Sequence, residues 1–389
     1  MDFTETLVAQ QQVVRLQALL EASRQLHSTI ELEEVVRIAL QIVVRELELE
    51  GAFFTCFVQV YGEVPEALLA ELSAPGSGSR DRSWFPPLQR FPLYDKSGAS
   101  FTELVALLPA GRTLDLDETD FLEALAVQAA VAIENARFHR RALEWQRVES
   151  DLAAARQVQQ SLVPQAMPEI ANYSIAARSV TCYEVGGDYL DFVPTPSGQI
   201  VGVVGDVAGK GLASALIGAS FRSAFRAMVH AELSLYEIAT KMNLLHYGEG
   251  EEARHRYVTA ILFRLDPATH TLEILNAGHN PAFLAAPDGA VTRINASGTP
   301  IGLLPFSTYS SQQLQFFAGA RLLVYTDGMT EVFNGDDEFG EDRLLQTFLE
   351  CQETWPDGAL SKVWHTLDTF AAGESQTDDM TALAVFRRT

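Results

Sequence analysis

Two patterns of apolar and polar positions divide the chain. Up to about residue 165, apolar residues recur mainly at the three- and four-residue spacing of amphipathic helices. Beyond that point, short apolar runs rich in β-branched and aromatic residues alternate with glycine-containing turns. The pattern therefore predicts a mainly helical N-terminal part and a C-terminal part built largely of strands.

The N-terminal part is expected to begin with two helices within residues 5–48. They are separated near Ser28 and Thr29, either of which would cap the second helix. A strand is expected over residues 51–62, GAFFTCFVQVYG, because this stretch is rich in β-formers and ends on glycine. Its neighbour at residues 73–87 is rich in Gly, Ser and Pro and is expected to be a surface loop.

A helix of unusual length is predicted from about Glu118 to Leu162, because this stretch contains neither proline nor glycine. At 1.5 Å per residue it would be about 70 Å long. Pro164 and Pro168 follow it and would end it. Its second half carries a short heptad-like seam, formed by Trp145, Val148, Leu152, Ala155, Gln159 and Leu162. The seam has two interpretations, a dimeric coiled coil or a helix lying on the surface of one domain.

The C-terminal part is expected to be an antiparallel α+β domain. Its strands follow one another largely in hairpin order, without the regular strand–helix alternation of a parallel sheet. The expected strands are YSIAARSV, QIVGVVGDV, RYVTAILFRLD, TLEILNAG, AFLAAPDG, RLLVYTDG and TALAVF. Helices are expected over residues 212–232, 235–247, 342–351 and 360–370.

Composition narrows the functional classes. With 28 basic and 51 acidic residues the formal charge is −23, and no basic patch is present, so a nucleic-acid partner is not expected. Cys56, Cys182 and Cys351 are far apart and lack CxxC spacing, which excludes a zinc ribbon and favours a reducing compartment. No apolar run approaches the ~18 residues of a membrane span, and the first residues are acidic and polar. A soluble, cytoplasmic protein without membrane association is therefore expected.

Acidic residues recur at or just beyond the ends of apolar strands. Desolvating such a carboxylate is costly unless a donor or a cation compensates for it. A single aspartate at a strand end is usually a turn former, but several in the same setting indicate a shared site. Ligation by oxygen alone, with no convergent His or Cys, would select Mg²⁺ or Mn²⁺. The residues concerned are Asp188, Asp191, Asp206, Asp327, Asp378 and Asp379.

From about Arg156 to the C-terminus, a series of motifs resembles the SpoIIE/RsbU-type branch of the metal-dependent (PPM) serine/threonine protein phosphatases. In order, these motifs are ARQVQQSLVP, GGDYLDF, GDVAGKGLASAL, YVTAILFRLDPATHTLEILNAGHNPAFL, GTPIGLL, YTDGMTEVFN, FGEDRL and DDMTALAV. The resemblance implies two packed antiparallel sheets flanked by helices, with two Mn²⁺ or Mg²⁺ ions at one edge. The family's metal ligands fall on Asp188, Asp206, the backbone carbonyl of Val207, Asp327 and Asp378.

By the same resemblance, Asp206 would bridge the two ions, and Asp188, Asp327 and Asp378 would complete the catalytic set. The implied reaction is in-line attack of metal-activated water on phosphoserine or phosphothreonine. The implied substrate is a STAS-domain anti-sigma-factor antagonist in a bacterial partner-switching pathway. The alternative is a pseudophosphatase that keeps the fold and binds a partner without turnover.

Three further residues have two interpretations each. Asp191 is either a hydrogen-bond acceptor that supports the site or a ligand. Lys210 is either a solvated turn residue or a phosphate contact, and His279 is either structural or an acid for the leaving oxygen. The arginine with which many eukaryotic relatives hold phosphate has no counterpart among the motifs.

The N-terminal part resembles a GAF sensory domain, through LHSTIELEEVVRIALQIVVRELELEGAFF and DETDFLEALAVQAAVAIENARFHRRALEW. The resemblance divides the chain into a GAF-like sensory or dimerisation domain at 1–138, a helical linker at 139–165 and a phosphatase domain at 166–389. It implies a homodimer formed through the first two. A signal detected by the GAF-like domain would reach the phosphatase domain through the linker.

Overall fold

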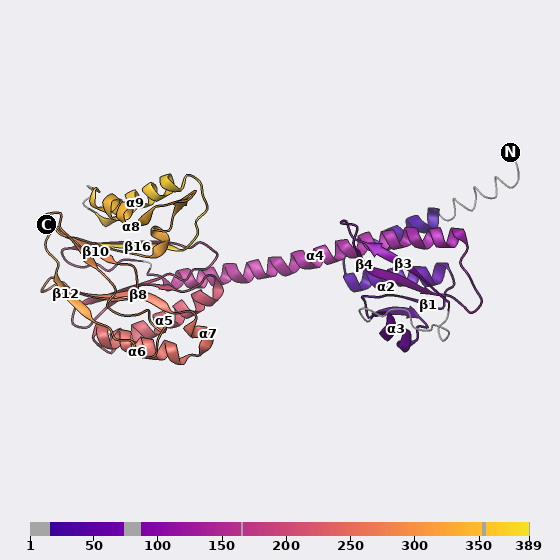
Figure 1. Ribbon diagram of the computed structural model, residues 1–389, viewed down its shortest axis with the longest axis horizontal. Helices are drawn as coiled ribbons and strands as arrows, with labels where there is room; N and C mark the ends of the chain where they lie inside the picture. The colour runs from indigo at the N-terminus through magenta and orange to yellow at the C-terminus, as the bar shows by residue number, and fades with distance from the viewer. Residues whose placement is uncertain (1–15, 74–86, 165, 352–354, 389) are drawn as a thin grey trace. The chain divides into compact units, whose positions relative to one another are not determined.

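The computed structural model describes residues 16–73, 87–164, 166–351 and 355–388. The chain divides into two compact units, Met1–Val148 and Glu149–Thr389, and the boundary falls within the long helix α4 (Leu116–Leu162) (Figure 1). Each unit has its own hydrophobic core. Within the described ranges, none of the helices combines the length and the apolarity needed to cross a lipid bilayer.

The N-terminal unit contains a four-stranded antiparallel sheet in the order β2-β1-β4-β3. Its strands are β1 (Gly51–Phe54), β2 (Val60–Gly62), β3 (Leu88–Tyr94) and β4 (Ser100–Leu107). Because strand side chains alternate, Phe54 enters the larger core, shared with a helix over residues 16–26, α2 (Leu32–Glu46) and α4. Phe53 points to the other face, where it packs with Leu68 of α3 (Glu66–Ser73).

The long helix expected before Pro164 is present, since α4 runs unbroken through 47 residues. Two local expectations for the N-terminal unit are wrong. The strand expected over residues 51–62 is a hairpin, in which β1 and β2 pair antiparallel with Gly51 opposite Gly62. Helix α2 begins after Glu31 without a side-chain cap; Thr29 instead accepts a hydrogen bond from the Glu31 backbone N–H at 3.1 Å.

The C-terminal unit is built around two five-stranded antiparallel sheets, in the orders β12-β9-β8-β7-β6 and β11-β10-β13-β16-β5. The strands of the first sheet are β6 (Tyr189–Pro194), β7 (Ile200–Val207), β8 (Val258–Asp266), β9 (Thr271–Ala277) and β12 (Ser311–Gln315). Those of the second are β5 (Tyr173–Val180), β10 (Ala282–Ala285), β11 (Val291–Ile294), β13 (Arg321–Tyr325) and β16 (Met380–Arg387). Two further strands of two residues each, β14 (Phe333–Asn334) and β15 (Asp337–Glu338), pair with each other outside these sheets.

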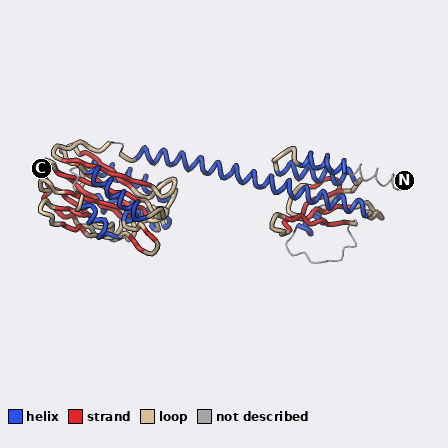
Figure 2. Tube along the Cα trace, turned by 90° about the horizontal axis from the view of Figure 1, so that it is seen from above, coloured by secondary structure: helices blue, strands red, loops and turns tan. Residues whose placement is uncertain are grey.

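The two sheets pack face to face between two layers of helices (Figures 1 and 2). Val204 of β7 and Leu383 of β16 point into the shared core, whereas their neighbours Val203 and Ala384 point outward. The outward residues of the first sheet meet α5 (Leu212–His230) and α6 (Leu235–Gly248), with α7 (Glu251–Arg254) following. Those of the second meet α8 (Gly340–Leu349) and α9 (Pro356–Ala371). This arrangement confirms the expected antiparallel sandwich flanked by helices.

Strand pairing brings the expected site residues to one edge of the sandwich. Asp188 directly precedes β6, whose first residue pairs with Gly205, one position before Asp206. In the second sheet β13 pairs with β16, so Asp327 lies just beyond the end of one strand and Asp378 just before the start of the other. Asp327 itself opens a short 3-10 helix, η1 (Asp327–Met329).

Candidate metal centre

The four carboxylates expected to bind metal interact electrostatically with one another. Burial raises the pKa of Asp206 to about 7, and the charges of Asp327 and Asp378 add to the effect. The pKa of Asp327 is raised by burial and then by Asp378. Burial, followed by the charge of Asp206, raises the pKa of Asp188 well above its usual value. The tertiary fold therefore gathers these four residues into one acidic cluster.

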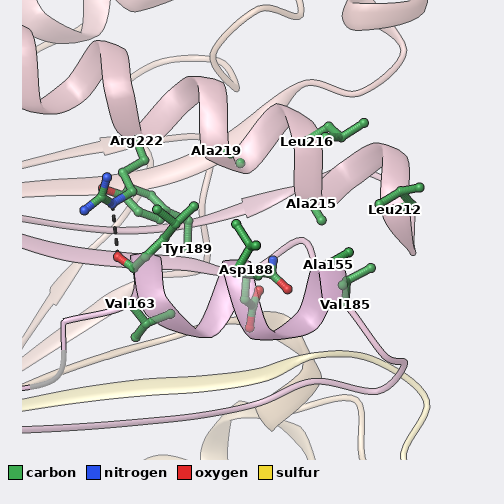
Figure 3. A pocket seen from close by; sticks show the side chains of 14 residues that line it. Ala155, Val163, Val185, Asp188, Tyr189, Leu212, Ala215, Leu216, Ala219 and Arg222 are labelled. Atoms are coloured by element: carbon green, nitrogen blue, oxygen red, sulfur yellow. Dashed lines mark hydrogen bonds between the residues drawn. The ribbon is translucent and has the colours of Figure 1, made fainter. Parts of the chain in front are cut away.

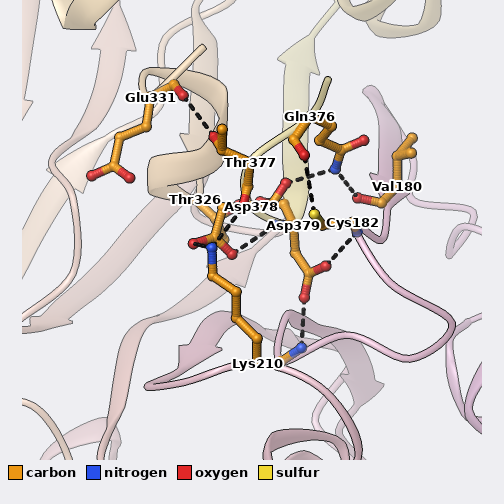
Figure 4. Close-up of polar contacts among 10 residues, drawn as sticks. Val180, Cys182, Lys210, Thr326, Glu331, Gln376, Thr377, Asp378 and Asp379 are labelled. Carbon is orange, nitrogen blue, oxygen red and sulfur yellow. Dashed lines mark hydrogen bonds and ion pairs between the residues drawn. The ribbon is translucent and has the colours of Figure 1, made fainter. Parts of the chain in front are cut away.

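The cluster is not arranged as a coordination sphere as it stands. Within the described part of the chain, no three or more His, Cys, Asp and Glu side chains are placed so that they could hold a metal ion. Lys210 occupies part of the space, because its Nζ forms a 2.9 Å ion pair with Asp378 and donates to the Thr377 carbonyl at 2.5 Å (Figure 4). The ammonium group offsets some of the negative charge that a cation would otherwise balance.

The donor set nevertheless fits a hard divalent cation. All the side chains concerned are carboxylates, and oxygen-only sites suit Mg²⁺ and Mn²⁺. Glu331, which the sequence did not single out, belongs to the same group. Its pKa is raised by partial burial and by the charges of Asp327 and Asp378. Five acidic side chains of like charge form an environment in which a cation would relieve repulsion.

The paired glycines in GGDYLDF are required by close backbone packing. A Cβ at Gly187 would lie 2.8 Å from the Val207 carbonyl oxygen, and one at Gly186 would lie 2.4 Å from Oδ2 of Asp379. Asp379 is buried and accepts hydrogen bonds from the backbone N–H groups of Cys182, at 2.7 Å, and Gly187, at 2.6 Å (Figure 4). Asp379 thus fixes the loop that carries Asp188.

Thr326 is a second residue of the site that the sequence did not reveal. Its side chain is fully buried, and Oγ1 donates a 2.9 Å hydrogen bond to Oδ2 of Asp188. The same oxygen accepts from the Thr381 backbone N–H at 2.9 Å. Thr326 therefore orients Asp188 from the neighbouring sheet, a contact that no local sequence pattern encodes.

Asp191 has the role of a buried ion-pair partner. It is 0% exposed and accepts from Arg226 Nε at 2.6 Å, from Arg226 Nη2 at 3.0 Å and from the Tyr189 hydroxyl at 2.6 Å. Arg222 lies 3.7 Å from the same carboxylate and donates to the Leu162 carbonyl at 3.0 Å. Asp191 therefore ties β6 to α5, which matches its interpretation as a supporting acceptor.

His279 is held by both of its ring nitrogens. Nδ1 lies 2.7 Å from the Thr259 hydroxyl and Nε2 lies 3.0 Å from the Tyr325 carbonyl, and the side chain is buried. Since a carbonyl only accepts, Nε2 carries the proton. Burial lowers the pKa of His279 from its usual 6.5 to about 4. The imidazole is therefore neutral at pH 7, which supports the structural interpretation over that of an acid.

The His279 pKa predicts a pH dependence of stability. Between pH 6.5 and 4 the unfolded chain binds a proton that the folded chain excludes, so the free energy of unfolding falls as the pH falls. Relative to His279→Gln, the wild type should lose about 2 kcal/mol between pH 7 and pH 5. Urea unfolding of both proteins at the two pH values measures this loss. If the difference in free energy of unfolding between the two proteins is the same at pH 7 and pH 5, His279 takes up a proton in the folded state.

A largely apolar cavity of about 220 Å³ lies beside Asp188, between the last turns of α4 and the first turns of α5 (Figure 3). Ala155 and Leu162 line it from α4, and Leu216 lines it from α5. On α4, Gln159 forms a pair of hydrogen bonds with Gly186, accepting from its N–H at 3.1 Å and donating to its carbonyl at 2.6 Å. The end of α4 thus contacts the loop that leads to Asp188.

Comparison with known proteins identifies the C-terminal part. Residues 196–388 match the family model described as Stage II sporulation protein E (SpoIIE). Protein IcfG of Synechocystis sp. is 26% identical over 263 residues, covering 61% of this chain and 41% of IcfG. Phosphoserine phosphatase RsbP of Bacillus subtilis is 32% identical over 151 residues, covering 38% of this chain and 37% of RsbP. The chain thus spans well under half the length of these relatives.

The fold agrees with this assignment. The SiaA-PP2C domain of Pseudomonas aeruginosa superposes with a TM-score of 0.55 at 19% identity, and the match covers 63% of this chain and 99% of that domain. At that identity the similarity establishes the fold alone. Residues 196–388 are therefore similar to the SpoIIE family, and the two-sheet sandwich has the PP2C-type phosphatase fold.

Proposed function

We propose that this protein is a metal-dependent protein serine/threonine phosphatase. The observation that carries the proposal is the acidic cluster of Asp188, Asp206, Asp327 and Asp378 at one edge of a PP2C-type sandwich. These four residues and the Val207 carbonyl would hold two Mn²⁺ or Mg²⁺ ions. The homology to phosphoserine phosphatase RsbP supports the assignment.

When bound, the two ions would supply an activated water and a positive charge next to the phosphoryl group. The residues of the chain hold and orient the ligands. Thr326 donates to Asp188, and Asp379 fixes the backbone of Gly187 close to the Val207 carbonyl. The movable group is Lys210, because its side chain is largely exposed and would have to release Asp378 for that carboxylate to bind metal.

The proposed substrate is a phosphoserine or phosphothreonine on a STAS-domain anti-sigma-factor antagonist, within bacterial partner switching in the cytoplasm. The test is release of phosphate from candidate phosphorylated STAS proteins by the full chain, in Mn²⁺, in Mg²⁺ and in EDTA. Hydrolysis that requires the metal is expected. No release from any phosphoserine substrate in either metal would contradict the proposal.

A second candidate function is a pseudophosphatase that binds a phosphorylated partner without turnover. The ion pair between Lys210 and Asp378 favours it, because it engages a carboxylate that is expected to be a metal ligand. Stoichiometric metal binding without phosphate release would support this function. The presence of all four expected ligands is the reason that hydrolysis is preferred.

We further propose that the N-terminal unit is a GAF-like sensory domain and that α4 mediates both homodimerisation and control of the site. Trp145 and Val148 of the predicted seam are 74% and 49% exposed and are available to a second copy. Ala155, Gln159 and Leu162 instead line the cavity against α5. A shift of α4 would therefore move Gln159 and, through Gly186, the loop that carries Asp188.

Ala155→Pro tests this coupling. Proline in a helix interior costs about 3 kcal/mol and would interrupt α4 just before the cavity. We expect a change in both the basal phosphatase rate and the oligomeric state, measured by phosphate release and by light scattering. Two variants at the exposed neighbour Ala154 serve as comparisons. Ala154→Pro breaks the helix to the same degree, and Ala154→Ser changes the residue without breaking the helix. An unchanged rate and mass in Ala155→Pro would contradict control through α4.

A further inference from the structure

A half-buried arginine, Arg256, lies against the loop that follows Asp206. Arg256 precedes β8, and among the residues that the structure describes no acceptor contacts its guanidinium group. The group lies against the loop between β7 and α5, because a Cβ at Gly209 would be 2.6 Å from Nη1 of Arg256. Gly209 follows Asp206 by three positions and directly precedes Lys210. A free cation therefore faces the loop next to the proposed metal ligands.

The backbone around Arg256 is fixed, so the fold determines where its side chain begins. The Arg256 N–H donates to the Ala253 carbonyl at 2.9 Å, and its own carbonyl lies 3.0 Å from Nε2 of the buried His246. The next residue, Tyr257, accepts from the Ala208 N–H at 2.8 Å, which continues the pairing of β7 with β8. These contacts hold Arg256 opposite Gly209.

The neighbouring end of α5 offers further donors. Its N-cap is Gly211, which provides no side-chain cap, so the first N–H groups of this 19-residue helix lack that partner. Ser214, in the first turn, is 0% exposed, and its Oγ has no hydrogen-bond partner in the described part of the chain. That oxygen lies 3.5 Å from the same Gly209 Cβ position that Arg256 approaches. The guanidinium, a buried hydroxyl and a helix N-terminus thus converge on one loop.

The nearby Arg254 has a structural role in this segment. Its Nε donates to the Tyr247 carbonyl at 2.9 Å, and its guanidinium lies 4.1 Å from the centre of the Tyr247 ring. Lys210 is also occupied, by Asp378 and Thr377. Arg256 differs from both, since its backbone is held while its guanidinium donors meet no acceptor among the described residues.

We propose that Arg256 and the N-terminus of α5 bind the phosphoryl group of the phosphoserine or phosphothreonine substrate. The inference rests on the proposed function and gives it the phosphate-binding arginine that the sequence motifs lack. A guanidinium suits a phosphomonoester dianion, because its planar donors can form two parallel hydrogen bonds to phosphate oxygens. Backbone N–H groups at a helix N-terminus add a positive electrostatic potential, which also favours the phosphate.

The test measures binding of inorganic phosphate to the Mg²⁺-loaded full chain by calorimetry, for the wild type and three variants. Arg256→Gln should weaken phosphate binding about tenfold, since a charge-assisted bidentate contact is lost. Arg256→Lys keeps the charge but not the planar guanidinium, so its phosphate affinity should lie between those of the wild type and Arg256→Gln. Arg254→Gln removes the same charge two residues away and should bind phosphate within about twofold of the wild type.

Hydrolysis of p-nitrophenyl phosphate provides a second measurement. Arg256→Gln should raise KM more than it lowers kcat, because the contact is already made in the bound substrate. Equal phosphate affinity in Arg256→Gln and the wild type, or an equal loss in Arg254→Gln, would overturn the inference, as would a wild type that binds no phosphate. If phosphate binds through Arg256 but no substrate is hydrolysed, the proposed function fails and this inference stands. Thermal unfolding of each variant checks that it is folded, and if Arg256→Gln is not, Arg256→Lys decides.

Discussion

Replacing Asp206 by asparagine is expected to abolish metal-dependent phosphate release and, at the same time, to make the metal-free protein more stable. Asp206 lies closest to the centre of the electrostatic network, since it interacts with Asp188, Asp327 and Asp378. Loss of this proposed metal ligand should reduce the rate by at least about 1,000-fold, or ~4 kcal/mol of transition-state stabilisation. Removing one charge from a buried acidic cluster should raise the free energy of unfolding in EDTA by about 2 kcal/mol.

The two effects have opposite signs, which separates them from general damage to the fold. Phosphate release in Mn²⁺ measures the first, and urea unfolding in EDTA measures the second. Asp288→Asn is the matched control, because Asp288 lies in the exposed β10–β11 turn, where it accepts a hydrogen bond from the Ala290 N–H at 3.0 Å. It should leave the rate within about twofold. Substantial metal-dependent activity in Asp206→Asn would remove this residue from the proposed metal centre.

Asp191→Ala is expected to have the largest effect on stability. The substitution leaves Arg226 and the Tyr189 hydroxyl without their acceptor in a site where Asp191 is fully buried. Breaking a fully buried ion pair by removing one partner costs about 3–5 kcal/mol, and because Arg226 is 37% exposed the loss here should lie at the lower end, about 3 kcal/mol. The loss should be measurable as a lower urea midpoint of the metal-loaded protein. Because β6 begins directly after Asp188, phosphate release should also fall.

A double-mutant cycle with Arg226→Met distinguishes the ion pair from simple loss of packing. If the pair is the cause, removing both partners should cost less than the sum of the single changes by about 1–3 kcal/mol. Arg343→Met provides the surface comparison, because Arg343 pairs with Asp337 at 3.1 Å and both side chains are largely exposed. Exposed pairs contribute about 0–1 kcal/mol. Strict additivity of the two changes would show that Asp191 and Arg226 do not act together.

Much of the fold could be predicted because its elements have strong local patterns. The strand YSIAARSV coincides with β5, and α4 lies within two residues of its expected start. Strands with mixed signals were missed. β3 contains Pro92, and β6 contains Asp191 and directly follows Asp188, so neither has the uniform apolar character of a core strand. β12, SQQLQ, is polar because it lies at a sheet edge.

The candidate site could be predicted only in part. Asp188, Asp206, Asp327 and Asp378 stand out because each lies at or next to the end of an apolar strand, a feature visible along the chain. Thr326 does not stand out in this way, and the sequence marks Asp379 without revealing its role. Both roles depend on contacts with partners that lie 138 and 192 positions away in the chain. Such contacts are determined by strand pairing between segments that no local pattern joins.

The sequence by itself determined the types and order of the elements, the excess of negative charge and the oxygen-rich donor set. These are properties of single residues and of short-range periodicity, which can be recognised without knowledge of the fold. Only the tertiary structure decided that Lys210 pairs with Asp378, that Asp191 faces Arg226 and that the free guanidinium of Arg256 lies against Gly209. The physical reason is that a charged group is costly to bury alone, and its partner is chosen by packing in three dimensions rather than by distance along the chain.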